Sequence, residues 1–158
     1  MSSTSAKHAA LSDRPSLAAS LDYYRLATFD LSWGGVVRGI EKESLRVSPT
    51  GALSQSVHPE ALGSTLTNPY ITTDLSESLL EFITPAYERI EDCLGMLEGI
   101  HRFTLTRLEN QEMLWGSSMP CALGGEDEIP IALFGTSNLG RLKTLYREGL
   151  SNRYGKIM

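Results

Sequence analysis

The stretch that decides the fold is Arg38-Gly39-Ile40-Glu41-Lys42-Glu43-Ser44-Leu45-Arg46-Val47, in which apolar and polar residues interleave. Val36, Ile40 and Val47 are β-branched, and such residues favour a pleated, half-buried strand. The tetrapeptide Ser48-Pro49-Thr50-Gly51 follows directly and is a turn signal. The sequence therefore predicts a strand over residues 36–47 that enters a hairpin.

A second extended segment is expected over residues 71–84, which are rich in Ile, Thr, Leu and Phe and stop at Pro85. Within it, Glu81 stands between Leu80 and Phe82 in an otherwise apolar run. One interpretation buries Glu81, so that its carboxylate needs a partner or a metal ion. The alternative is a strand with Leu80 and Phe82 toward the core and Glu81 toward water.

The helices follow from apolar spacing and from helix stop signals. Apolar residues recur at three- and four-residue intervals between Tyr87 and Leu108, which is the pattern of an amphipathic helix. Further helices are expected over residues 17–31, which Gly34-Gly35 would end, over 59–66, and from a Ser137 or Asn138 cap to about Asn152. This last helix places Leu142, Tyr146 and Leu150 on one stripe. Strands followed by helices indicate the α+β class.

Composition limits the kind of protein this is. The 158 residues include 14 Lys and Arg against 19 Asp and Glu, for a net charge of −5, and 41% are hydrophobic. This is one globular domain, without the basic surface that nucleic-acid binding needs or an apolar run long enough for a membrane span. Residues 1–15 are expected to be a flexible leader before a domain over 16–158. Two cysteines are too few for a disulfide scaffold, so a reducing cytoplasm is the expected location.

An acidic pair lies inside the first predicted strand. Glu41 and Glu43 point to the same face, roughly 6.5 Å apart along the strand. Their repulsion would be removed by a hard cation such as Mg²⁺, which binds one or two carboxylates together with substrate phosphates. Alternatively, this is a solvated strand face whose charge Lys42 and Arg46 relieve. Asp74 could join a metal shell or accept backbone hydrogen bonds in a turn.

The C-terminal segment has the opposite charge. Residues 141–156 hold five basic residues and one acidic residue. Lys143 and Arg147 are four residues apart, so on a helix they share a face that could bind an anion such as phosphate. A solvated basic surface is the simpler alternative. A basic face beside an acidic Mg²⁺ site is, however, what phosphoryl transfer from a nucleotide requires.

Several short motifs, in order, resemble one family. They are residues 38–47, His58-Pro59-Glu60-Ala61-Leu62-Gly63-Ser64, residues 71–74 and 80–85, Ser118-Met119-Pro120, residues 135–138, residues 143–150, and Asn152-Arg153-Tyr154-Gly155. Together they resemble the N-terminal part of the proteobacterial glutamate–cysteine ligases, from about Gly34 to Met158. The resemblance implies a glutamine-synthetase-like antiparallel sheet with helices, incomplete in this chain. It also implies ATP- and Mg²⁺-dependent joining of the L-glutamate γ-carboxylate to the L-cysteine amine through γ-glutamyl phosphate, the first step of glutathione biosynthesis.

The resemblance also implies roles for individual residues. Glu41, Glu43 and Glu81 would hold Mg²⁺, with Asp74 as a further ligand. Substrate would be bound by Tyr146, Leu75, Leu150 and Arg147, the first three lining a cysteine pocket. Position 75 is often aromatic in the family and is leucine here, which puts that wall of the pocket in question.

Family members are much longer, and a metal-binding histidine follows the segment that matches residues 154–158. We therefore expect a truncated ligase domain that is inactive when isolated. The alternative is a non-catalytic metal- or nucleotide-binding module. Expected ligands are L-glutamate, L-cysteine and ATP, with no nucleic acid, no membrane and no obligate protein partner evident. If later strands complete the sheet, apolar residues on its face should be unusually exposed, namely Val36, Ile40, Leu80 and Phe82.

Overall fold

The computed structural model describes residues 16–26 and 35–156 of the chain. It divides the chain into two compact units, residues 1–34 and residues 35–158. Within the first unit, helix α1 covers Leu17–Leu26, which confirms the predicted helix as far as Leu26. Residues 27–34, and the leader predicted over residues 1–15, lie outside the described residues. The domain boundary after residue 15 therefore stays a prediction.

The second unit is built on an antiparallel sheet with the strand order β2-β3-β1-β4. Its strands are β1 (Glu41–Val47), β2 (Ile71–Thr73), β3 (Leu79–Ile83) and β4 (Met113–Leu114). The segment predicted as one extended run over 71–84 is a hairpin, because the chain turns between β2 and β3. The Asp74 N–H donates to Leu79 O at 3.1 Å, and the Leu79 N–H donates to Ser76 O at 3.1 Å. The predicted turn after β1 is confirmed by a Gly51 N–H to Ser48 O bond of 2.9 Å.

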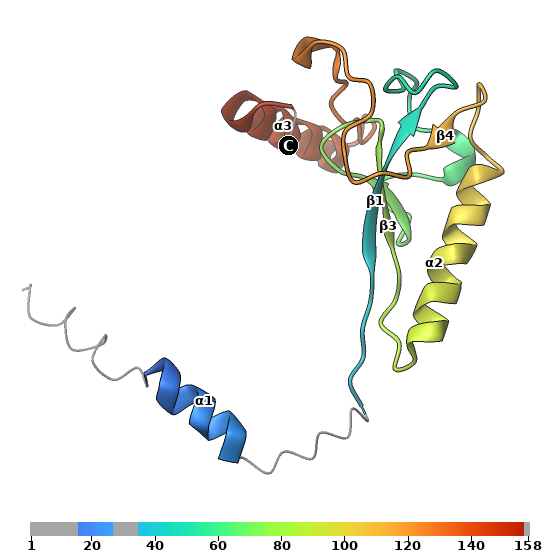
Figure 1. The fold of residues 1–158 in the computed structure, drawn as a ribbon. Coiled ribbons are helices and arrows are strands. Elements are labelled where there is room, and N and C mark those ends of the chain that lie inside the picture. Colours follow the sequence, from blue (N-terminus) through green and yellow to red (C-terminus); the bar gives the residue numbers. More distant parts are fainter. Residues whose placement is uncertain (1–15, 27–34, 157–158) are drawn as a thin grey trace, which may run out of the picture. The chain divides into compact units, whose positions relative to one another are not determined.

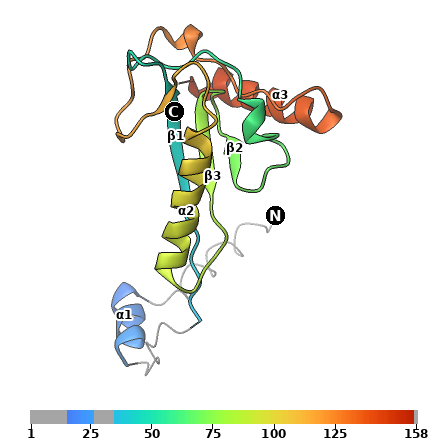
Figure 2. The same cartoon turned by 90° about the vertical axis from the view of Figure 1, so that its right-hand side faces the viewer.

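Helix α2, Ile90–Leu105, covers one face of this sheet. Figures 1 and 2 show it running beside β1 and β3. Leu80 and Phe82 are fully buried in the cluster that α2 joins through Ile100. Their expected exposure is therefore wrong, since α2 supplies the cover locally. Val36 is 43% exposed, as expected.

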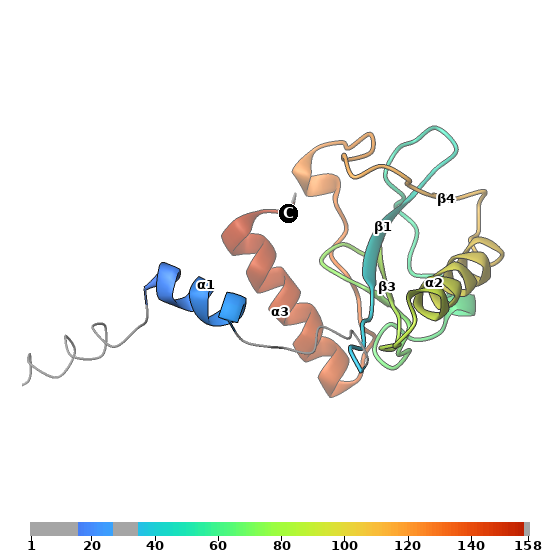
Figure 3. The same ribbon diagram turned by 60° about the horizontal axis from the view of Figure 1, so that its bottom comes forward.

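Helix α3, Asn138–Tyr154, lies on the other side of β1 and β3 from α2 (Figures 1 and 3). Its cap is Ser137, whose hydroxyl accepts a hydrogen bond from the Gly140 N–H at 3.0 Å, and this confirms the predicted start. Gly140 lies so close to the preceding loop that an added Cβ would be 2.1 Å from Phe134 O. The helix is therefore packed on residues 134–135 through its first turn.

Short 3₁₀ helices complete the unit: η2 (Glu60–Leu62), inside the predicted helix 59–66, and η3 (Glu126–Glu128). A second apolar cluster lies at the C-terminal end of β1 and consists of Val47, Leu53, Cys121 and Ile129. No helix among residues 16–26 and 35–156 has the length and apolar character to span a membrane.

Candidate functional site

Three carboxylates share the face of the sheet that α2 does not cover. Strand register places Glu43 directly opposite Glu81, and Glu41 opposite Ile83. Because side chains alternate along a strand, Glu41, Glu43 and Glu81 point to the same face. This confirms the predicted parity of the acidic pair. For Glu81 it confirms the alternative in which Leu80 and Phe82 face the core, and Glu81 is half-buried rather than enclosed.

The pKa values of Glu43 and Glu81 are raised. Burial is the largest cause of the raised pKa of Glu43 and of Glu81, and the charge of Asp74 is the second. Glu41 adds to both shifts, whereas the Arg147 guanidinium opposes them. Two like charges that lie directly across from each other on neighbouring strands are destabilising. The sheet thus holds an excess of negative charge on this face.

Two basic side chains of α3 partly offset the negative charge of the acidic face. Arg147 Nη2 lies 2.9 Å from Asp74 Oδ1, in an ion pair that joins α3 to the β2–β3 turn. Lys143, one helical turn earlier, stacks its Nζ 4.1 Å from the centre of the Phe134 ring. Burial and the neighbouring Arg147 lower the pKa of Lys143, while Glu81 and Asp74 raise it. The shared face predicted for Lys143 and Arg147 is therefore the one directed at the carboxylates.

The charge relief expected from within β1 does not occur. Lys42 and Arg46 have even numbers in the strand, so they point to the α2 side. Lys42 stacks 5.9 Å from the centre of the Phe82 ring. Arg46 is completely buried and pairs with Glu112 at 2.9 Å. The interpretation of a solvated face relieved by Lys42 and Arg46 is wrong in this respect.

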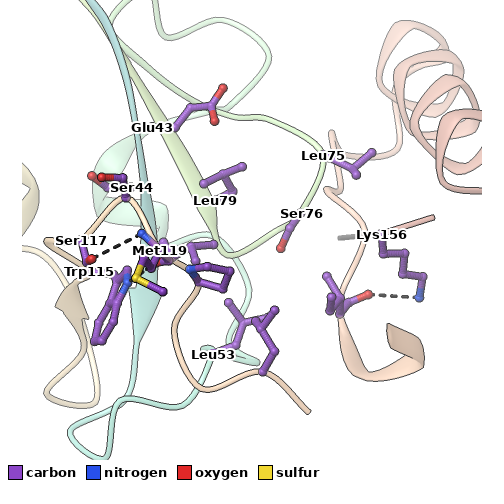
Figure 4. A pocket seen from close by; sticks show the side chains of 15 residues that line it. Glu43, Ser44, Leu53, Leu75, Ser76, Leu79, Trp115, Ser117, Met119 and Lys156 are labelled. Atoms are coloured by element: carbon purple, nitrogen blue, oxygen red, sulfur yellow. Dashed lines mark hydrogen bonds between the residues drawn. The ribbon is translucent and has the colours of Figure 1, made fainter. Parts of the chain in front are cut away.

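A pocket of about 390 Å³ adjoins the acidic face, and Glu43 forms part of its wall. Figure 4 shows Glu43 at the top of the view, Leu79 and Leu53 below it, and Leu75 and Lys156 to the right. The Lys156 ammonium donates to Ile129 O at 3.1 Å. The pocket therefore combines leucine side chains with one acidic residue, Glu43, beside the acidic face.

The predicted cysteine-pocket residues are not all brought together in this pocket. Leu75 is buried and forms part of its wall. Tyr146 is 61% exposed on α3, and Leu150 is half-buried. Neither lines this pocket. Neighbouring helix residues are turned by about 100°, so Tyr146 is directed away when Arg147 points at Asp74.

Other residues of the site gave little signal in the sequence. Trp115 and Met119 line the pocket from the turn-rich segment 111–130, where no periodicity marks them and only Met119 belongs to a motif of the family. Lys156 was counted only as part of the basic segment. Glu77 is buried in the β2–β3 turn, and both of its carboxylate oxygens accept backbone N–H groups. A polar residue between two serines looks like an ordinary turn residue.

The acidic face suits a hard cation in its donor type and its charge. Carboxylate oxygens are preferred ligands of Mg²⁺, which often takes only one or two of them and completes its shell with water and phosphate. Glu43 and Glu81 meet this requirement as a pair, and their pKa values are raised first by burial and then by the neighbouring carboxylates. Among the described residues, no three or more His, Cys, Asp or Glu side chains form a ready-made metal site.

Comparisons with a family model and with known proteins point to the same family. Residues 28–158 match the family model for glutamate–cysteine ligase. The glutamate–cysteine ligase of Pseudomonas fluorescens (strain Pf0-1) is 60% identical over 122 residues, which are 77% of this chain and 23% of that protein. That of Alcanivorax borkumensis is 53% identical over 124 residues, or 78% of this chain and 23% of that protein.

Two solved structures resemble the fold. One is the glutamate–cysteine ligase of Francisella tularensis in complex with AMP, with a TM-score of 0.73 and 47% identity, covering 77% of this chain and 24% of that one. The other is a bifunctional glutathione synthetase of Pasteurella multocida, with a TM-score of 0.66 and 37% identity, covering 75% of this chain and 15% of that one. The chain thus spans about a quarter or less of the length of these relatives. On the strength of the family model and these identities, the chain belongs to the glutamate–cysteine ligase family.

Proposed function

We propose that this chain provides the acidic face of the active site of a ligase that joins L-glutamate to L-cysteine at the expense of ATP. The observation that carries the proposal is the pairing of Glu43 with Glu81 on a sheet face whose charge Arg147 of α3 partly offsets. Carboxylates and cations arranged in this way are what phosphoryl transfer needs, because that reaction depends mainly on positioning and charge neutralisation. Family membership supports the same reaction.

The proposed reaction has two steps. The γ-carboxylate of glutamate attacks the terminal phosphorus of ATP and releases ADP. The cysteine amine then attacks the carbonyl carbon of γ-glutamyl phosphate, so that a new amide bond forms and inorganic phosphate leaves. This reaction is the first step of glutathione biosynthesis.

The residues have separate parts in this proposal. Glu41, Glu43 and Glu81 would hold Mg²⁺, with Asp74 beside them. Magnesium, when bound, supplies neutralisation of the phosphate charges. Lys143 and Arg147 attract anionic substrate groups to the space beside the carboxylates. Tyr146, Leu75 and Leu150 are proposed to contact cysteine.

Substrates and location complete the proposal. The ligands are small molecules, L-glutamate, L-cysteine and ATP, and the Francisella tularensis relative in complex with AMP supports nucleotide binding. We propose a cytoplasmic location. Cys93 and Cys121 are both free thiols, which is compatible with a reducing compartment.

A chimera tests the proposal. The segment of the Pseudomonas fluorescens relative that matches residues 35–156 is replaced by those residues, and ADP release is measured with ATP, Mg²⁺, glutamate and cysteine. We expect ADP release that requires both amino acids. Glu81→Gln should raise the Mg²⁺ concentration for half-maximal rate and lower turnover by at least about tenfold, since removing one charged ligand weakens a metal site.

The control is Glu109→Gln, which removes an identical charge from an exposed position away from the sheet face. Its Mg²⁺ dependence should equal that of the unmodified chimera. A folded chimera without ADP release would contradict the proposal. So would a Glu81→Gln chimera with an unchanged requirement for Mg²⁺.

A further inference from the structure

The β2–β3 turn contains a buried carboxylate that belongs neither to the acidic face nor to the pocket. Glu77 is 4% exposed. Its Oε1 accepts the His58 N–H at 2.8 Å, and its Oε2 accepts the Leu133 N–H at 2.7 Å. Each oxygen of this carboxylate accepts a hydrogen bond from the backbone of a different loop, so the carboxylate fixes the positions of both loops.

The loop that contains Leu133 is also the support of α3. The Phe134 N–H donates to the Thr144 hydroxyl at 3.4 Å, and the Phe134 ring stacks under the Lys143 ammonium. Gly140 packs against the backbone of Phe134 without room for a side chain. Through Leu133 and Phe134, the Glu77 carboxylate is therefore connected to the first two turns of α3.

The same turn reaches α3 a second time. Asp74, three residues before Glu77, pairs with Arg147 on the next turn of the helix. Further backbone bonds fasten the turn to the loop, from the Glu77 N–H to Pro130 O at 2.9 Å and from the Ala132 N–H to Leu75 O at 3.0 Å. The β2–β3 turn thus holds α3 at two points, and only one of them is a group of the acidic face.

We infer that Glu77 is a positioning residue, whose carboxylate sets the distance between the cations of α3 and the carboxylates of the sheet. The inference deepens the proposed function, on which its catalytic meaning rests, because ATP and glutamate must fit between these two sets of charges. Without the Glu77 carboxylate, the Asp74–Arg147 ion pair and the backbone bonds between turn and loop remain, but Leu133 loses the contact that fixes the loop under α3. A displacement of about 1 Å is enough to impair a reaction that depends on alignment.

Hydrogen exchange in the full 158-residue chain tests the geometry without any activity. The Phe134 N–H donates to the Thr144 hydroxyl of α3 at 3.4 Å. Its exchange therefore reports separation of α3 from the supporting loop. Glu77→Gln replaces one acceptor by an NH₂ donor that faces a backbone N–H, and we expect Phe134 N–H exchange to accelerate about tenfold or more. Glu60→Gln, an exposed control, should leave it unchanged.

The amides of Leu80 and Phe82 in β3 separate positioning from general stability. Positioning predicts that their exchange in Glu77→Gln stays within about twofold of the parent chain, because the strand ladder does not depend on α3. Equal acceleration at Phe134 and in β3, or none at Phe134, overturns the inference. If Glu77→Gln does not fold, Glu77→Asp, which keeps both oxygens, is judged by the same criteria. A failure of both variants to fold also overturns it.

A functional measurement links the geometry to the reaction. In the chimera described above, at a temperature where circular dichroism shows it fully folded, Glu77→Gln should lower kcat/KM about tenfold. Glu60→Gln should not change it. Unchanged kcat/KM in Glu77→Gln overturns the positioning role. An inactive parent chimera contradicts the proposed function instead and leaves the exchange result standing.

Discussion

Replacing Glu81 by glutamine should stabilise the chain in the absence of divalent cations. The change removes one of two like charges placed directly opposite each other on β1 and β3. Such a pair costs up to about 1 kcal/mol, and because Glu43 is exposed and Glu81 half-buried, solvent screening keeps the cost near ~0.5 kcal/mol. For a unit of this size, that corresponds to a rise in Tm of about 1–3 °C.

The dependence on pH has a definite sign. Since the pKa of Glu81 and of Glu43 is raised in the folded state, each group favours folding fully below its unfolded pKa. That contribution is lost as the pH rises through the folded pKa. The advantage of Glu81→Gln should therefore be small near pH 4, grow as the pH increases, and be complete at pH 7.

Magnesium should reverse the order of stability. A ligand that binds only the folded chain adds about 1.4 kcal/mol at ten times its Kd, and the unmodified chain should gain this while Glu81→Gln gains less. The assay is a thermal melt followed by circular dichroism, with and without Mg²⁺, with Glu109→Gln as the matched control. If Glu81→Gln is less stable than the unmodified chain without Mg²⁺, Glu43 and Glu81 do not repel each other as described. If it gains as much stability from Mg²⁺ as the unmodified chain, Glu81 does not bind Mg²⁺.

Three further outcomes are expected. Gly140→Ala should lower Tm markedly, because the added Cβ would meet the Phe134 carbonyl oxygen. Gly149→Ala in the same helix has open space and should raise the free energy of unfolding by up to about 1 kcal/mol. Coinciding melts of the two variants would contradict this. In urea unfolding, Arg46→Met should cost about 3–5 kcal/mol because it leaves a buried carboxylate unpaired, against less than about 1 kcal/mol for the exposed Arg102→Met; similar losses would show that the Arg46 pair is not the cause. The isolated 158-residue chain should release no ADP that depends on both glutamate and cysteine, since a partial metal shell does not support catalysis, and such release would disprove the prediction.

The acidic face was predictable because it depends on local geometry. Alternation along a strand is enough to place Glu41 beside Glu43 and to separate Glu81 from Phe82. The helix from Asn138 and its Ser137 cap follow equally from neighbouring residues. The resemblance to a family then joined these local features into one site.

The parts that sequence reasoning missed depend on contacts between distant residues. Arg46 looked like an exposed strand residue, and its partner Glu112 lies 66 positions away. The β2–β3 turn lacks glycine and proline, so the segment 71–84 looked like a single strand. The resemblance predicts that Tyr146 contacts cysteine; the structure adds that its side chain is exposed on α3.

Paramagnetic broadening of amide signals by Mn²⁺ tests most directly whether the carboxylates of the sheet bind a divalent cation. In the full chain, we expect the signals of Glu41, Glu43 and Glu81 to disappear first as Mn²⁺ is added, and excess Mg²⁺ to restore them. The acidic turn Glu126–Glu128 has three neighbouring carboxylates and serves as an internal comparison. If the signals of residues 126–128 are lost before those of the sheet, the carboxylates of the sheet are not the preferred site of the divalent cation.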